Sequence, residues 1–254
     1  MMKWHKEDLI RIAKRENNSK RMYVLVNPLQ GKHIPADPGK ALGLFRELAG
    51  ELKGYAGERL LLIGFAETAT AIGAAAAVEL GAWYMQTTRE AIPGVRFLRF
   101  SEDHSHATQQ ALIRDDMDQV IRQADRIVFI EDEVTTGRTI LHIIEALNAA
   151  YPGPGAHRYA VASLINGMGT ESRKIYQELG IPLHYLIEAD TDPAVYIRAA
   201  EKIPENGTYV PLDLDAGCME HVKEIRVGGR SDARRLVEAR AYQAACERLC
   251  AEVL

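Results

Sequence analysis

The chain has 254 residues, of which 47% are hydrophobic and 26% charged, and its formal net charge at pH 7 is −4. This composition supports a globular core, and the mild acidity gives no sign of a nucleic-acid or membrane partner. No apolar run approaches the ~20 residues of a membrane span, and the charged N-terminus lacks a signal-peptide core, so we expect a cytoplasmic protein.

Strands and helices are predicted to alternate along most of the chain. The apolar patterns predict strands over residues 23–26, 60–65, 83–88, 95–100, 126–130, 159–165 and 183–187. They predict helices over residues 39–52, 68–80, 107–123, 139–150, 171–179 and 232–253. We expect strands 83–88 and 95–100 to pair with each other, and we assign no structure to residues 197–230. The alternation predicts an α/β fold, doubly wound, with a mainly parallel sheet covered by helices on both faces.

Residues 127–139, IVFIEDEVTTGRT, are the most informative stretch of the chain. Apolar residues typical of a buried strand end in two carboxylates, Glu131 and Asp132, and a polar loop then leads into a helix. Such a loop can hold an anion against backbone N–H groups at the positive end of the helix dipole. Carboxylates suit sugar hydroxyls or a hydrated divalent cation instead. A ribose 5-phosphate unit with a metal-bound substituent satisfies all these demands.

Other polar or glycine-bearing loops also follow predicted strands. Ligands of open α/β sheets sit outside the carboxyl ends of the strands. We therefore expect one pocket to be formed by the loops at residues 27–35, 64–69, 131–139 and 166–170.

The thirteen-residue stretch resembles the PRPP-binding motif of the type I phosphoribosyltransferases (PRPP is 5-phosphoribosyl 1-pyrophosphate). The resemblance implies that Glu131 and Asp132 hydrogen-bond the ribose hydroxyls and take part in catalysis. It implies that Mg²⁺ arrives with PRPP, with Asp132 as a candidate ligand. It also implies a loop around the 5-phosphate, made by Thr135, Thr136, Gly137, Arg138 and Thr139.

The loop GFAETAT, residues 64–70, resembles by position the pyrophosphate loop of the same family. Backbone N–H groups of Ala66, Glu67 and Thr68 would then face the pyrophosphate. Glu67 departs from the family pattern because it is acidic where an anion should sit. It would bind Mg²⁺ indirectly, hydrogen-bond the loop, or cap the following helix.

By position, residues 83–107 resemble the mobile flap of this family. Arg89 is suited to clamp a pyrophosphate or carboxylate, although a solvated surface arginine is an equally good reading. His104 is a candidate acid or base near neutral pH, together with His106 two residues on. The alternative is that these histidines belong to a polar lead into the next helix.

Lys32 and His33, in NPLQGKHIP, and Asn166, after a predicted strand, are candidate substrate contacts. With the loops above, these strings resemble one branch of the family over residues 21–166. This is the orotate-phosphoribosyltransferase-like branch found with bacterial tellurite-resistance and stress gene clusters. Its members are thought to make a nucleoside-like metabolite.

The resemblance implies a Mg²⁺-dependent phosphoribosyltransferase that joins PRPP to a nucleobase-like or other small nucleophile and releases pyrophosphate. It implies a homodimer and three segments: an extension over residues 1–20, a transferase domain with a flap or hood over 21–230, and a C-terminal helix over 231–254 packed on that domain. Two alternatives stay open. One is a non-catalytic PRPP-binding regulator, and the other is a phosphatase or nucleotide hydrolase that uses the acidic pair with a metal.

Overall fold

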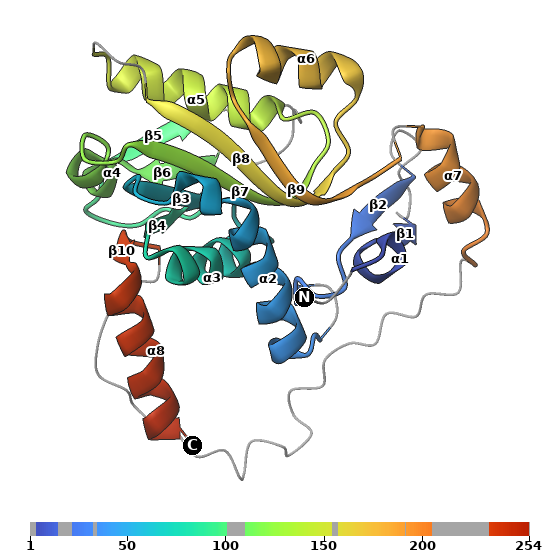
Figure 1. Ribbon diagram of the computed structural model, residues 1–254, viewed down its shortest axis with the longest axis horizontal. Helices are drawn as coiled ribbons and strands as arrows, with labels where there is room; N and C mark the ends of the chain where they lie inside the picture. The colour runs from blue at the N-terminus through green and yellow to red at the C-terminus, as the bar shows by residue number, and fades with distance from the viewer. Residues whose placement is uncertain are drawn as a thin grey trace.

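A six-stranded sheet forms the centre of the computed structural model, which describes residues 4–14, 22–32, 35–100, 110–153, 157–190, 192–204 and 234–253. The strand order is β10-β4-β3-β7-β8-β9 (Figure 1). The five longer strands are parallel, and β10 runs antiparallel to β4. Their bounds are β3 Leu60–Gly64, β4 Trp83–Gln86, β7 Arg126–Val134, β8 Arg158–Asn166, β9 Leu183–Glu188 and β10 Val237–Glu238.

Helices cover both faces of this sheet, which confirms the predicted α/β class. Helices α2 (Pro38–Glu51) and α3 (Thr70–Leu80) lie on one face, with α8 (Ala239–Val253) beside α3. Helices α5 (Arg138–Ala150) and α6 (Thr170–Glu178) lie on the other face (Figure 1). A short 3₁₀ turn, η1 (Lys53–Tyr55), follows α2.

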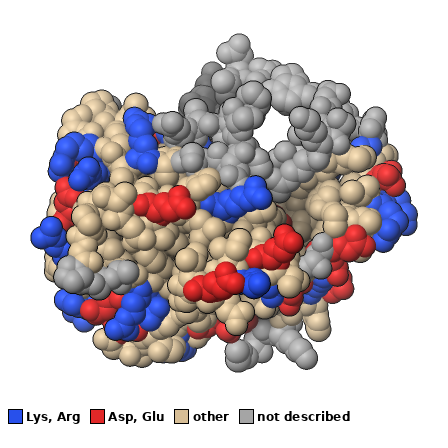
Figure 2. All heavy atoms as spheres, turned by 90° about the horizontal axis from the view of Figure 1, so that it is seen from above, with Lys and Arg blue, Asp and Glu red and all other residues tan. Residues whose placement is uncertain are grey.

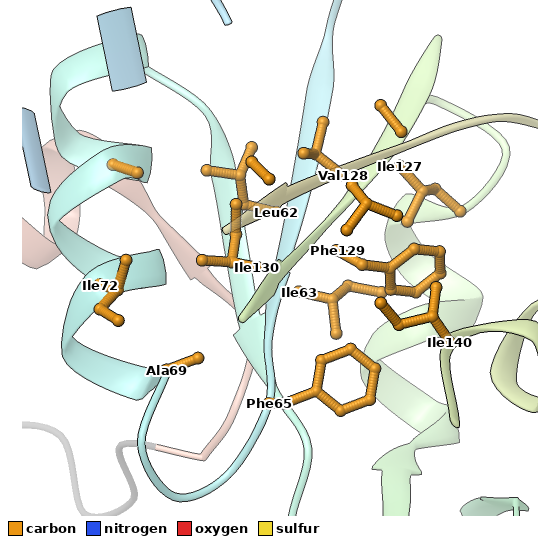
Figure 3. Packing of buried hydrophobic residues seen from close by; sticks show 14 of the residues in the cluster. Leu62, Ile63, Phe65, Ala69, Ile72, Ile127, Val128, Phe129, Ile130 and Ile140 are labelled. Atoms are coloured by element: carbon orange, nitrogen blue, oxygen red, sulfur yellow. The ribbon is translucent and has the colours of Figure 1, made fainter. Parts of the chain in front are cut away.

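The core is built on the alternation of side chains along β3 and β7. Leu62 and Ile130 point toward Ile72 of α3, whereas Phe129 points toward Ile140 of α5 (Figure 3). All five side chains are at most 2% exposed. Burial of each such side chain contributes roughly 1.5–3 kcal/mol to folding. The two strands that precede the candidate site are therefore anchored in the core.

A separate hairpin stands beyond the carboxyl ends of the strands. It pairs β1 (Arg11–Lys14) with β2 (Tyr23–Val26) in antiparallel register, and α1 (Lys6–Leu9) and α7 (Pro193–Glu201) lie beside it (Figure 1). The predicted strand 23–26 exists, but it belongs to this hairpin and not to the central sheet. Its partner β1 lies in the segment expected to be an extension, since four residues are too few to give a periodic signal.

Two expectations for the middle of the chain are wrong. Strand β4 does not pair with residues 95–100, because it returns from α3 into the sheet beside β3. Strand β5 (Phe97–Phe100) instead pairs with β6 (Gln110–Ile113), so residues 107–123 are not one helix. The helical part, α4 (Arg114–Val120), begins only after four consecutive buried residues. Residues 107–109 lie outside the described part of the chain.

Several element boundaries also differ from the prediction. Strand β7 continues past Ile130 to Val134, because the equally long β8 pairs with it along its length. The C-terminal helix begins at Ala239, after β10, and the predicted residues 232 and 233 are not described. Helix α7 was not predicted, although Asp192 caps its N-terminus and Pro193 occupies its first turn.

Charged side chains of both signs are intermingled on the face seen in Figure 2. No helix in the described part of the chain combines the length and apolarity needed to cross a membrane. That no nucleic acid binds stays a prediction.

The C-terminal segment is held by a buried carboxylate. Asp116 of α4 is 2% exposed and accepts hydrogen bonds from the Arg235 guanidinium at 2.6 Å and from the Leu236 amide at 2.7 Å.

Asp116→Ala is expected to lower the free energy of unfolding by roughly 2–3 kcal/mol, since charged hydrogen bonds are lost. Urea unfolding of Asp116→Ala, Arg235→Ala and the double variant measures this. If the loss of stability in the double variant equals the sum of the losses in the two single variants, Asp116 and Arg235 do not stabilise each other.

A second prediction concerns pH. Tyr55 Oη lies 2.7 Å from Nε2 of His184, and burial lowers the pKa of His184 below its ordinary value of 6.5. The folded state therefore binds the proton more weakly than the unfolded chain. Neutral His184 therefore contributes to the free energy of unfolding. This contribution is complete above pH 6.5 and is lost as the pH falls through the lower folded-state pKa of His184. Between pH 7.5 and 5.0, the wild type should lose more stability than His184→Gln, and parallel stability curves would contradict this.

Candidate functional site

A cavity of about 500 Å³ opens at the carboxyl end of β7. Strand order reverses between β3 and β7, which is where open α/β sheets bind ligands. The cavity wall comes from the end of β7, the following loop, the first turn of α5, and β2 of the hairpin. Its lining residues are Tyr23, Glu131, Glu133, Val134, Thr135, Thr136, Gly137, Arg138, Thr139 and Ile140.

The acidic residues lie on the strand itself and not in the loop. Because β7 keeps its register with β8 through this stretch, successive side chains alternate between the two faces. Glu131 and Glu133 therefore line the cavity, while Asp132 faces the other way. Glu133 was not among the predicted site residues. The signal that could have found it is its spacing of two from Glu131, had the strand been extended past Ile130.

Asp132 joins three segments that are far apart in the sequence. Its carboxylate accepts a hydrogen bond from Thr68 Oγ1 at 2.9 Å and another from Gln30 Nε2 at 3.2 Å. Thr68 belongs to the predicted pyrophosphate loop, and Gln30 to the loop that follows β2. These two loops thus meet at Asp132, and neither of them lines the cavity, so the expected single pocket built from four loops is not what the cavity shows.

Beyond β7, the chain turns sharply into α5. Gly137 is in the left-handed region, with φ 72°, and its carbonyl accepts a hydrogen bond from Tyr176 Oη at 2.7 Å. Thr135 and Thr136 are exposed toward the cavity, and Arg138 begins the helix. The first-turn N–H groups of a helix and its dipole favour an anion at this position.

The loop after β3 is held in place by buried polar contacts. The Ala66 amide donates to Thr87 Oγ1 at 2.8 Å, and the Thr87 hydroxyl donates to Gln110 Oε1 at 2.5 Å. The Ala66 amide is therefore engaged inside the protein and does not face an anion as expected. The peptide bond between Ala66 and Glu67 is cis.

Glu67 forms an ion pair that links this loop to the one after β2. Lys32 Nζ lies 2.6 Å from the Glu67 carboxylate. This contact lowers the pKa of Glu67, and Arg89 lowers it further. Both partners are substantially exposed, so the pair itself adds little to stability. It does bring Lys32 to Glu67, next to Thr68, which donates to Asp132.

Three other predicted residues have different outcomes. Asn166 is 2% exposed, and its carboxamide oxygen accepts a hydrogen bond from the Met168 amide at 2.9 Å. It therefore shapes the loop after β8 and does not line the cavity, because a short buried side chain in a tight turn bonds its own backbone. His33 and His104 lie outside the described residues. Tyr23 lines the cavity, although no local pattern marked it.

Within the described ranges there is no group of three or more His, Cys, Asp or Glu side chains placed to hold a metal ion. Glu131 and Asp132 are nevertheless the type of ligand that Mg²⁺ prefers, namely carboxylate oxygens. The Asp132 carboxylate is already oriented by two neutral donors. These residues fit a hydrated Mg²⁺ that shares its ligands with a bound phosphate compound.

Known proteins resemble this chain in both sequence and fold. A hypoxanthine/guanine phosphoribosyltransferase of Methanothrix thermoacetophila is 32% identical over 81 residues, which are 32% of this chain and 40% of that protein. The adenine phosphoribosyltransferase of Trypanosoma brucei, solved with AMP, pyrophosphate and ribose-5-phosphate, has 14% identity. The match covers 83% of this chain and 88% of the Trypanosoma brucei chain, with a TM-score of 0.55. The adenine phosphoribosyltransferase of Rhodothermus marinus has 16% identity to this chain and a TM-score of 0.52. The match covers 72% of this chain and 96% of that protein.

These two structures share the fold, and the sequence match spans less than half of the Methanothrix protein. The model of the family described as phosphoribosyl transferase matches residues 9–191, which is well over half of the chain. On this evidence the chain belongs to the phosphoribosyl transferase family.

Proposed function

We propose that this protein transfers the 5-phosphoribosyl group of PRPP to a nucleobase-like nucleophile in a Mg²⁺-dependent reaction that releases pyrophosphate. The observation that carries the proposal is the hydrogen bond between Thr68 and Asp132. It joins the loop after β3 to the acidic end of β7 beside a phosphate-type loop. A ligand with an anion at each end and a sugar between them matches this arrangement.

Each part of PRPP then has its own partner. The 5-phosphate lies in the loop Thr135–Thr139, against the N-terminus of α5. The ribose hydroxyls donate to Glu131 and Asp132, which accept hydrogen bonds as carboxylates. The pyrophosphate lies beside Glu67 and Thr68, where it competes with Glu67 for Lys32 and draws Arg89. Arg89 is suited to this role because its planar fork binds two phosphate oxygens at once.

The reaction breaks the C1–O bond of the ribose and forms a bond from C1 to the acceptor. Positive charge develops on the sugar ring as pyrophosphate leaves with the bonding electron pair. Glu131 and Asp132 favour that charge, since fixed carboxylates near it need no reorganisation. The acceptor nitrogen then forms its bond to C1 and gives its proton to the departing pyrophosphate. The protein therefore acts mainly by positioning and by electrostatic stabilisation.

Magnesium enters this scheme with the substrate. Phosphate oxygens and ribose hydroxyls are hard ligands that Mg²⁺ prefers, and Asp132 is the carboxylate that would hold the ion on the protein side. When bound, the ion neutralises charge on the leaving pyrophosphate. The proposal includes a homodimer in solution, which light scattering measures. It also includes membership of the branch associated with tellurite-resistance and stress gene clusters.

The test measures pyrophosphate release from PRPP and Mg²⁺ over a set of nucleobases, with PRPP binding followed by calorimetry. We expect binding that requires Mg²⁺ and release that requires an acceptor. Binding without release would favour the regulator, which the Lys32–Glu67 ion pair also supports because it pairs Lys32 with a carboxylate of the proposed pyrophosphate loop. Phosphate release from other esters, without PRPP, would favour the hydrolase.

A further inference from the structure

A buried polar cluster lies beside the proposed pyrophosphate loop. Its members are Thr87, which follows β4, and Gln110, the first residue of β6, and their exposed fractions are 0% and 4%. Burial of polar side chains is costly unless their hydrogen bonds are satisfied, so each such group in a folded protein needs an explanation. Here the explanation is the backbone of Ala66, in the loop after β3.

The cluster contacts both polar groups of Ala66. The Thr87 hydroxyl accepts from the Ala66 amide at 2.8 Å and donates to Gln110 Oε1 at 2.5 Å. A hydroxyl has one proton to give, and giving it to the carboxamide oxygen leaves Nε2 of Gln110 for the Ala66 carbonyl. That contact is the longest of the three, at 3.5 Å. The three hydrogen bonds close a ring that fixes the peptide groups on both sides of Ala66.

Backbone hydrogen bonds hold the two side chains of the cluster in place. The Thr87 amide donates at 3.0 Å to the carbonyl of Gly64, the last residue of β3. Thr88 and Ala111 exchange two hydrogen bonds of 2.9 Å, which join the residue after Thr87 to the residue after Gln110. Both side chains therefore extend toward the loop from a backbone that is itself paired.

The loop from Ala66 to Thr68 lies between two buried anchors. Phe65 and Ala69, which flank it (Figure 3), are at most 1% exposed, and the Ala69 amide donates to the Phe65 carbonyl at 3.1 Å. Because both ends are fixed, a rotation of the peptide groups at Ala66 has to be taken up by Glu67 and Thr68. These are the residues beside which we place the pyrophosphate.

We infer that Thr87 and Gln110 are positioning residues for the proposed reaction. They hold the peptide groups of Ala66, and these set the backbone of Glu67 and Thr68 at the leaving-group end of PRPP. Fixed polar groups around a leaving group need no reorganisation as charge develops, so a shift of the loop weakens both binding and turnover. Neither positioning residue touches the ligand. This inference rests on the proposed function and deepens it by naming the residues that act on its leaving-group end.

The test measures the two halves of PRPP separately. Calorimetry gives one Kd for pyrophosphate with Mg²⁺ and another for ribose 5-phosphate, and urea unfolding is followed in parallel. Thr87→Val keeps the volume of the side chain but removes the hydroxyl at the centre of the cluster. Its Kd for pyrophosphate should rise roughly 10- to 30-fold, since the Ala66 amide loses its acceptor, and kcat/KM for PRPP should fall similarly. Its Kd for ribose 5-phosphate should stay within about twofold of the wild type.

Thr87→Ser is the conservative variant, because it restores the hydroxyl and lacks only a methyl group. Its Kd for pyrophosphate should return to within about threefold of the wild type. Gln110→Met should weaken pyrophosphate binding less than Thr87→Val. The double variant should lose no more than Thr87→Val alone, because both residues act through Ala66. Gln119→Met is the matched control, since this exposed carboxamide on α4 also donates to a backbone carbonyl, that of Asp115, at 3.2 Å. It should leave each Kd within about twofold.

The outcomes separate this inference from the proposed function. The inference is overturned if Thr87→Val weakens pyrophosphate and ribose 5-phosphate equally, since the cluster would then only support the fold. An unchanged Kd for pyrophosphate, a serine variant as weak as the valine one, additive losses in the double variant, or a wild type that binds PRPP but not pyrophosphate would also overturn it. In all these cases PRPP binding by the wild type leaves the proposed function standing. If the urea curve shows that Thr87→Val is unfolded, Gln110→Met is judged by the same two Kd values. If the wild type binds neither PRPP nor pyrophosphate with Mg²⁺, both proposals fail.

Discussion

Asp132→Asn is expected to lower kcat/KM for PRPP by roughly 100- to 1,000-fold while the fold stays intact. The substitution keeps the shape of the side chain and one acceptor oxygen, so Thr68 can still donate. It removes the negative charge that the proposed scheme places beside the ribose and Mg²⁺. Loss of one preorganised electrostatic contact in a transition state has effects of this size. Steady-state pyrophosphate release at saturating acceptor measures it.

Asp190→Asn provides a matched control, since this carboxylate is exposed and pairs with Lys6 at 2.6 Å in the hairpin region. It should change kcat/KM by less than about twofold.

Thr68→Val tests the positioning of Asp132, because it removes the hydroxyl that donates to Asp132 and keeps the volume of the side chain. We expect a smaller loss of roughly 10-fold, seen mainly in kcat, since a neutral hydrogen bond is weaker than a charge. Full activity of Asp132→Asn, with a normal unfolding curve, would remove Asp132 from the proposed role.

The parts of the site that could be predicted are those encoded locally. Strand β7, its acidic end, the threonine loop and α5 follow one another without interruption, so the periodicity and the change in residue type reveal them. Strand β3, the loop after it and α3 are continuous in the same way. That the loop after β3 reaches the acidic end of β7 then follows from a rule about sheet topology and needs no long-range information.

The contacts that complete the site are long-range, and no local pattern predicts them. Gln30 contacts Asp132 across 102 positions of sequence, and Tyr176 contacts Gly137 across 39. Tyr23 reaches the cavity only because its strand leaves the central sheet and pairs with β1. A strand of four residues carries the same apolar signal in a sheet or in a hairpin, so its sequence cannot distinguish the two placements.

The error at residues 107–123 has a related physical cause. Gln110–Ile113 are fully buried, because β6 pairs with β5 and covers Thr87 and the loop after β3. Their apolar residues continue directly into the polar α4, and together the two segments mimic one amphipathic helix. What separates them is the partner strand, which lies earlier in the chain.

Gly137→Ala is the second substitution for which we expect a large effect, a loss of roughly 2–4 kcal/mol in the free energy of unfolding. Two costs add. The backbone has φ 72°, which disfavours a side chain by about 1 kcal/mol. A Cβ would also lie 2.5 Å from Tyr176 Oη and 2.6 Å from Met168 Cε. Met168 can bend away, but Tyr176 is 1% exposed and has little room to move, so overpacking costs a further 1–3 kcal/mol, roughly.

The same change should weaken PRPP binding by at least about 10-fold, since any movement that relieves the contact displaces the Gly137 carbonyl and the first turn of α5, where we propose that the 5-phosphate binds. Gly180→Ala separates the two costs, because that glycine has φ 64° and nothing within 4 Å of an added Cβ. It should lose only about 1 kcal/mol and keep PRPP binding. Tyr176→Phe removes the nearest atom, so Gly137→Ala should cost less in that background than in the wild type. Equal losses for Gly137→Ala and Gly180→Ala would show that packing against Tyr176 does not hold the loop, and the geometry proposed for the 5-phosphate would lose its support.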